Sequence, residues 1–145
     1  MKFGARFEPK ALEELALAAG GYPYFIQEYG KAIWDLAPAT PFTQTDAVLA
    51  IKAGRSQLDS GFFPARWERA TKSERNYLRA MAQDGEQSCT TKTVADRLHS
   101  SHQSLGPARA GLIAKGLTYA PEHGLVAFTV PGMADFILRQ HDANE

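Results

Sequence analysis

The sequence predicts a mainly α-helical protein in two parts, with one short β-hairpin in the second part. Two observations favour this fold class. Through most of the chain, apolar residues recur at the three- and four-residue spacing of a helix face, with glycine and proline at the interruptions. A period of two, typical of a half-buried strand, occurs at residues 125–130.

Composition indicates an ordinary globular protein, since 44% of the 145 residues are hydrophobic and 22% are charged. The 16 Lys and Arg residues balance the 16 Asp and Glu residues, so net charge predicts no bulk attraction to nucleic acid or membranes. The single cysteine, Cys89, excludes a disulfide framework within the chain. No apolar run approaches the ~20 residues of a membrane span, and residues 1–6 lack the apolar core of a signal peptide. We therefore expect a soluble cytoplasmic protein.

Three helices are predicted in the first part. The first covers about residues 9–19 and stops at the pair of glycines that follows. The second covers about residues 23–37 and ends before a proline. The third opens with a capping sequence at Thr43 and Asp46, and is expected to end at Gly61 and Pro64.

A domain boundary is predicted between a first domain of residues 1–64 and a second domain of residues 65–145. Three large aromatic residues lie close to it: Phe62, Phe63 and Trp67. They are too apolar for a solvated linker. We expect them to be buried where the two domains pack together.

The second domain begins with a capping box at Thr71 and Glu74, which opens a helix that ends near Gly85. A short helix is predicted around residues 94–98. After a polar turn, a further helix covers about residues 105–115.

Two apolar segments at residues 117–120 and 125–130 flank a four-residue turn and predict a β-hairpin. Pro131 then begins a last helix, with Met133 and Phe136 on one face. Three helices, a hairpin and a helix is the order of a winged helix-turn-helix. The predicted fold class is therefore a three-helix bundle followed by a winged helix-turn-helix with a β-hairpin wing.

A family resemblance is carried by two segments. Residues 20–30 read Gly-Gly-Tyr-Pro-Tyr-Phe-Ile-Gln-Glu-Tyr-Gly and resemble the start of the second lid helix in AAA+ ATPases, including archaeal-type, signal-transducing and origin-recognition-like members. Residues 109–119 read Arg-Ala-Gly-Leu-Ile-Ala-Lys-Gly-Leu-Thr-Tyr and resemble the recognition helix and first wing strand of their C-terminal winged helix. The resemblance covers nearly the whole chain, with its parts in the same order.

The resemblance implies the C-terminal part of an AAA+-type ATPase, with a lid-like first domain that helps sense ATP or ADP held with Mg²⁺. The implied partner is an N-terminal ATPase core outside this sequence. Gly21, Tyr22 and Pro23 are similar to the superfamily's GxP element and are the implied nucleotide contacts in the parent protein. The arginine that many members carry at the start of this helix is absent, and the next basic residue is Lys31. A helix stop and a helix start also explain these three residues without a ligand.

Catalytic motifs are absent from the sequence, so we predict that it is not an enzyme. It contains no G-x-x-x-x-G-K-[ST] loop to cradle phosphates, and no apolar run that ends in paired carboxylates for Mg²⁺. His99 and His102 lack the further ligands that a zinc site needs. No metal site or cofactor is predicted within this sequence itself.

Local charge favours double-stranded DNA as a partner of the second domain. Arg97, Arg109 and Lys115 lie in or next to the predicted recognition helix, and no acidic residue occurs between Leu98 and Ala120. Because a recognition helix lies in the major groove among phosphate contacts, these three are the predicted DNA-binding residues. The helix has few side chains that reach base edges, so two alternatives stay open. The winged helix docks on a protein, including its own ATPase core, or it is a free-standing transcription regulator.

Overall fold

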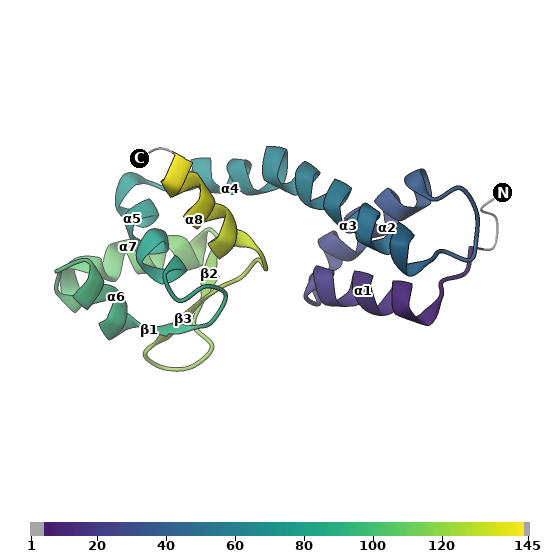
Figure 1. Ribbon diagram of the computed structural model, residues 1–145. Helices are drawn as coiled ribbons and strands as arrows, with labels where there is room; N and C mark the ends of the chain where they lie inside the picture. Colours follow the sequence, from purple (N-terminus) through teal and green to yellow (C-terminus); the bar gives the residue numbers. More distant parts are fainter. Residues whose placement is uncertain (1–4, 144–145) are drawn as a thin grey trace. The chain divides into compact units, whose positions relative to one another are not determined.

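The computed structural model describes residues 5–143 and is mainly helical, with one small antiparallel sheet (Figure 1). The chain forms two compact units, whose boundary in the sequence falls between Phe62 and Phe63. Each unit buries apolar side chains of its own. Across residues 5–143, every helix is too short or too polar to span a bilayer.

The first unit is built from α1 (Pro9–Ala19), α2 (Pro23–Leu36) and α3 (Gln44–Gln57), which pack against one another (Figure 1). The three predicted helices are thus confirmed. The capping box that opens α3 is formed: the Asp46 amide donates to Thr43 Oγ1 at 3.1 Å, and the Thr43 amide donates to Asp46 Oδ2 at 2.9 Å. These bonds satisfy two amides that have no partner within the helix.

The core of this unit consists of small, aliphatic and aromatic residues: Ala11, Leu15, Ala19, Phe25, Tyr29, Ile33, Ala47, Ala50 and Ile51. The buried face of α1 follows a four-residue spacing, so Leu12, although it is three residues from Leu15 and apolar, is 56% exposed. Val48 is exposed as well. In both helices alanines occupy the buried positions beside these residues, which brings the helices close together.

Helical backbone continues beyond the predicted end of the third helix, so the stop expected at Gly61 is wrong. After α3 comes a π-helical turn, η1 (Leu58–Phe62), and then α4 (Phe63–Arg69). In a π turn each N–H bonds five residues back, which loosens the regular ladder. Pro64 has no N–H to donate, and it lies directly after this loosened turn, near the start of α4.

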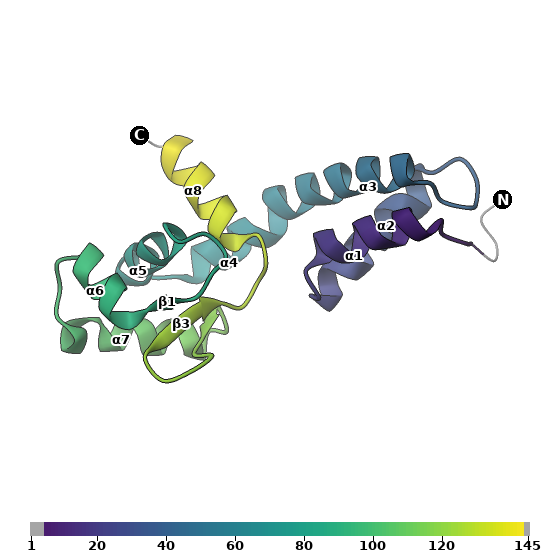
Figure 2. The same cartoon turned by 60° about the horizontal axis from the view of Figure 1, so that its bottom comes forward.

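The second unit begins with α4 and continues with α5 (Lys72–Ala82), β1 (Cys89–Thr90), α6 (Thr91–Arg97), α7 (His102–Ala114), β2 (Thr118–Tyr119), β3 (Leu125–Phe128) and α8 (Met133–Ala143). The strands form an antiparallel sheet in the order β1-β3-β2, and Figure 2 shows β1 beside β3. The predicted hairpin is confirmed, with Thr118 opposite Phe128. β1 was not predicted, because a strand of two residues shows no period in the sequence. It pairs Cys89 with Val126.

The aromatic residues near the boundary each have partners in their own unit. Phe63 stacks on Phe136, with ring centroids 5.4 Å apart. Trp67 is buried as predicted, and the guanidinium carbons of Arg75 and Arg79 lie 5.2 Å and 5.1 Å from the centroid of its ring. Phe62 stacks on a tyrosine of the first unit, Tyr24, with centroids 4.8 Å apart. The expected packing of one domain on the other stays a prediction.

Candidate nucleic-acid interface

α6 and α7 are joined by a short turn in which His99 takes a left-handed backbone conformation, with φ of 51°. α7 starts at His102, three residues earlier than predicted, because Ser101 caps it. The Ser104 amide donates to Ser101 Oγ at 3.2 Å. The polar turn of the sequence therefore supplies the cap of α7, Ser101, and its first residue, His102.

α7 presents two different faces along its length. One face is exposed and carries Gln103, Pro107, Ala110 and Ala114 at helical spacing, with Ser104 exposed beside it. On the other face, His102, Leu105, Gly106 and Arg109 line a cavity. The exposed face carries polar side chains at its N-terminal end and small side chains further along.

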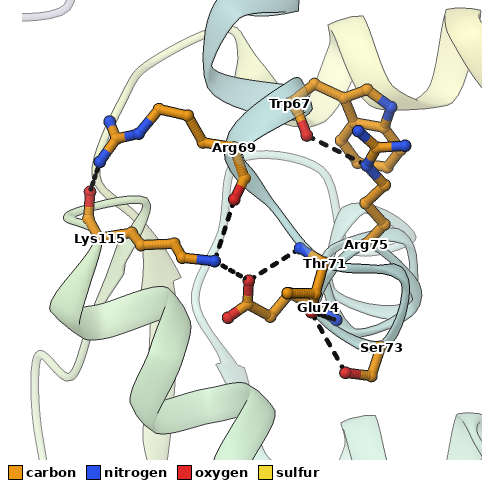
Figure 3. A network of polar contacts seen from close by, with 7 residues as sticks. All are labelled: Trp67, Arg69, Thr71, Ser73, Glu74, Arg75 and Lys115. Atoms are coloured by element: carbon orange, nitrogen blue, oxygen red, sulfur yellow. Dashed lines mark hydrogen bonds and ion pairs between the residues drawn. The ribbon is translucent and has the colours of Figure 1, made fainter.

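Lys115, predicted as a DNA contact, is held inside the second unit. Its Nζ forms an ion pair with the carboxylate of Glu74 and donates a hydrogen bond to the Arg69 carbonyl at 3.0 Å (Figure 3). In return, an Arg69 guanidinium nitrogen donates to the Lys115 carbonyl at 3.4 Å. These bonds connect the C-terminal end of α7 to the segment between α4 and α5.

Glu74 is the centre of this network and is only 5% exposed (Figure 3). Its Oε1 accepts from the Thr71 amide at 2.9 Å, which forms the predicted capping box. Burial raises the pKa of Glu74, but the hydrogen bonds and charge of Lys115 together with the bonds from Thr71 outweigh burial, so the pKa lies below 4.5. The carboxylate is therefore ionised at neutral pH, as the ion pair with Lys115 requires.

Arg97, the second predicted DNA contact, is also engaged within the unit. Its guanidinium donates to the Ala80 carbonyl at 2.8 Å and pairs with Asp84 at 2.7 Å. The pair joins the end of α5 to α6. Thus two of the three predicted DNA-binding cations have a carboxylate partner on the same unit.

Arg109 differs from both. It has no hydrogen-bond or ion-pair partner among residues 5–143, and its Nε atom is buried. Its two terminal nitrogens are not fully buried, so they are accessible. Arg109 is therefore the predicted contact whose charge is available to a ligand.

A cavity of about 630 Å³ is lined by α7 and by the turn that joins β2 to β3. Its lining residues come from α5, α6, α7 and this turn: Tyr77, Thr91, His102, Leu105, Gly106, Arg109, Ala120, Glu122, His123 and Gly124. The Thr91 amide donates to the Gly124 carbonyl at 2.9 Å, which holds the turn against the start of α6. Tyr77 and Thr91 were missed in the sequence, where nothing distinguishes a cavity wall from an ordinary core position.

The residues that the resemblance implied as nucleotide contacts form the turn between α1 and α2. Gly21 has a φ of 76°, and Pro23 is exposed at the first position of α2. Tyr22 is half-buried, and its ring contacts those of Phe25 and Phe62 at centroid distances of 4.9 Å and 6.2 Å. Pro23 is accessible to a ligand, whereas the Tyr22 ring is largely used in packing.

Metal and thiol chemistry have little support in the part of the chain described. Within residues 5–143, no group of three or more His, Cys, Asp and Glu side chains is placed to hold a metal ion. Cys89 is buried, and burial raises the pKa of its thiol, which keeps the nucleophilic thiolate scarce at neutral pH.

A family model described as a domain of unknown function, DUF8462, matches residues 60–137. The chain belongs to this family. The match runs from the π turn η1 into α8 and so includes α7 and the cavity. No curated protein matches the chain.

Proposed function

We propose that in this member of the DUF8462 family the second unit is a winged helix-turn-helix that binds double-stranded DNA through α7. The order of its elements supports the proposal: α5, then α6 and α7 joined by a short turn, then the β2–β3 hairpin beside α7. In this motif the second helix of the turn enters the major groove, and its N-terminal residues contact base edges.

The exposed face of α7 is the observation that carries the proposal. Its first turn carries exposed Gln103 and Ser104, both of which have hydrogen-bonding side chains. A glutamine amide can donate to and accept from adenine at the same time, which distinguishes that base from the other three. Further along, Ala110 and Ala114 are exposed and small, so bulky side chains do not hold the helix away from the groove.

The contacts proposed here differ in part from those predicted from the sequence. Arg109 remains a phosphate contact, because its charge has no carboxylate partner among the described residues. Lys115 holds the end of α7 through its ion pair with Glu74, and Arg97 joins α6 to the end of α5 through its ion pair with Asp84. We assign base recognition to Gln103, which the charge pattern of the sequence did not indicate.

The test is selection of duplexes from a random library by the 145-residue chain, followed by anisotropy titrations at two salt concentrations. Gln103→Ala should cost about 1–3 kcal/mol on the selected site and leave the salt dependence unchanged. Arg109→Gln should flatten the slope of log K against log salt by ~0.9. Gln87→Ala, a matched change at an exposed position in the loop before β1, should change neither quantity. Binding that is indifferent to both α7 substitutions would exclude this helix as the contact surface.

We also propose that the first unit is the lid of an AAA+-type ATPase and contributes to sensing ATP or ADP. The turn from Gly20 to Pro23 supports this, because both glycines have positive φ and Pro23 is exposed. A further support is the number of large apolar side chains that the unit leaves exposed: Leu12, Leu17, Tyr24, Ile26, Val48 and Leu49. Leu17 is 73% exposed. Surfaces of this kind mark protein contacts, here with an ATPase core.

The lid proposal is tested on the protein as its gene encodes it. A phosphate-binding loop encoded upstream of Met1 is expected, and Pro23→Ala should weaken nucleotide affinity while the circular dichroism spectrum stays the same. The 145-residue chain by itself should not hydrolyse ATP. Equal nucleotide affinity in the variant and the wild type would leave the turn as a helix boundary and nothing more.

Protein docking is the second candidate function of the winged helix, and one observation favours it. Among the described residues, α7 and its surroundings offer Arg109 as an unpaired cation, whereas proteins that depend on phosphate neutralisation make roughly six or more such contacts. If no duplex binds the chain at low salt, we expect α7 to contact the ATPase core or another protein.

A further inference from the structure

The cavity beside α7 is lined mostly by side chains that donate hydrogen bonds. Among its lining residues, Tyr77, Thr91, His102, Arg109 and His123 carry donors, and the one carboxylate is that of Glu122. Glu122 is exposed in the β2–β3 turn and has no ion pair with Arg109. A cavity rich in donors fits a ligand rich in acceptors.

Tyr77 is the most deeply buried of these donors. The residue is 1% exposed, and its hydroxyl has no hydrogen-bond partner among residues 5–143. The hydroxyl oxygen is nevertheless not fully buried, so it faces the cavity. Burial raises the pKa of Tyr77 although the charge of Arg109 opposes that change. The phenol therefore keeps its proton at neutral pH and acts as a donor.

The Thr91–His102 pair always keeps one hydrogen-bond donor free. The Thr91 hydroxyl and Nε2 of His102 are 3.2 Å apart and share one hydrogen bond. A neutral imidazole has one N–H and the hydroxyl has one O–H, so one of these two hydrogens joins the pair and the other is free.

Arg109 supplies the charge of the cavity. Packing around its buried Nε holds the side chain, while its terminal nitrogens stay accessible. A guanidinium presents its N–H groups in a plane that matches two oxygens of a phosphate. The neighbouring cations Arg97 and Lys115 are already paired, so Arg109 has the accessible guanidinium on this side of α7.

We infer that this cavity binds a phosphate group, held by Arg109, the Tyr77 hydroxyl and the free donor of the Thr91–His102 pair. Phosphate oxygens are acceptors that match each of these groups. At about 630 Å³ the cavity is larger than a phosphate ion, so it also admits a phosphate that is part of a larger molecule. The source is either free phosphate or the backbone of duplex DNA. Only the second source rests on the proposed function.

Inorganic phosphate is the probe for the first experiment, which follows the amide NMR spectrum of the 145-residue chain at pH 7. Sodium chloride replaces phosphate at equal ionic strength in the reference titration. We expect saturable shifts confined to residues at the cavity, including the amides of Gly106, Arg109 and Gly124. Chloride should not reproduce them.

Three variants make the test specific. Arg109→Gln should weaken phosphate binding at least tenfold, and Tyr77→Phe, which removes a single hydroxyl, about two- to tenfold. Lys72→Gln removes one exposed positive charge from α5, away from the cavity lining, and should leave the affinity unchanged. The amide spectrum of each variant shows directly whether it is folded. If Arg109→Gln does not fold, Tyr77→Phe decides.

Three results would overturn the inference. The first is the absence of saturable amide shifts at phosphate concentrations up to about 0.1 M, where charges in solution are screened beyond about 10 Å. The second is equal affinity in wild type and the cavity variants, and the third is the same shifts with chloride. A second titration with duplex DNA separates the sources. A duplex that displaces phosphate identifies the DNA backbone as the ligand, and phosphate binding without any duplex binding supports the site while it counts against the proposed function.

Discussion

The carboxylate of Glu74 occupies the space that a Cβ atom at position 111 would need. Oε2 of Glu74 is the nearest heavy atom to the ideal Cβ position of Gly111, which lies in α7. The same carboxylate is fixed by the Thr71 amide and by Nζ of Lys115. Gly111 is thus required by the close approach of α5 and α7, since its φ lies outside the left-handed region.

The effect of Gly111→Ala should change sign with the residue at position 74. In the wild type, the added methyl displaces a carboxylate that is held by charged hydrogen bonds, at a cost of about 1.5–3 kcal/mol. With Glu74→Ala in place the space is empty, and alanine should stabilise the helix by ~0.8–1 kcal/mol relative to glycine. Urea unfolding of the four proteins measures both effects. The same sign in both backgrounds would contradict the contact.

Glu74 should also make stability depend on pH in the acid range. Its pKa in the folded protein lies below 4.5, so its ion pair stabilises the fold fully above that value. The contribution is lost as pH falls through the pKa of the folded state. Glu74→Gln keeps a capping side chain but removes the charge. The free energy of unfolding of the wild type should exceed that of the variant at pH 7, and the difference should shrink towards pH 3. A constant difference would exclude the ionised carboxylate as its cause.

Gly54 in the first unit should tolerate a side chain as poorly as Gly111 does in the second unit. The ring of Tyr29, which is buried between α2 and α3, occupies the place of a Cβ at position 54. Gly54→Ala should therefore cost about 1–3 kcal/mol by overpacking. Gly30→Ala is the matched control, since Gly30 is inside α2 with no atom near its Cβ position, and it should stabilise by about 0.5–1 kcal/mol. Chemical unfolding of the two variants should give opposite changes.

The turn between α6 and α7 should tolerate glycine at position 99 and reject β-branched residues. His99 has a positive φ, a conformation that costs an ordinary residue roughly 1–2 kcal/mol and costs valine at least as much. His99→Val should lower the thermal midpoint, whereas His99→Gly should leave it unchanged or raise it. A valine variant as stable as the glycine variant would show that the left-handed turn is not retained in solution.

Local signals in the sequence were enough to predict most of the elements. The capping boxes at Thr43 and Thr71 use side chains three residues apart, and the glycines after α1 stop that helix through their own backbone freedom. Because such interactions join neighbours in the chain, they do not depend on the rest of the fold. The β-hairpin was predictable for the same reason, since a short turn joins its two strands.

Only the tertiary structure determines which charged residues at the candidate site are paired and which are accessible. Lys115 and Glu74 are 41 positions apart, and Arg97 and Asp84 are 13 apart, so no local pattern shows that these cations are already paired. Arg109 has the same charge as Arg97 and yet keeps it available. The difference is one of packing. Glu74 of α5 lies at the end of α7, and Asp84, just after α5, lies at the end of α6, whereas α5 places the neutral hydroxyl of Tyr77 in the cavity beside Arg109. A sequence shows how many cations a segment carries, but only the fold determines which of these cations are accessible to a ligand.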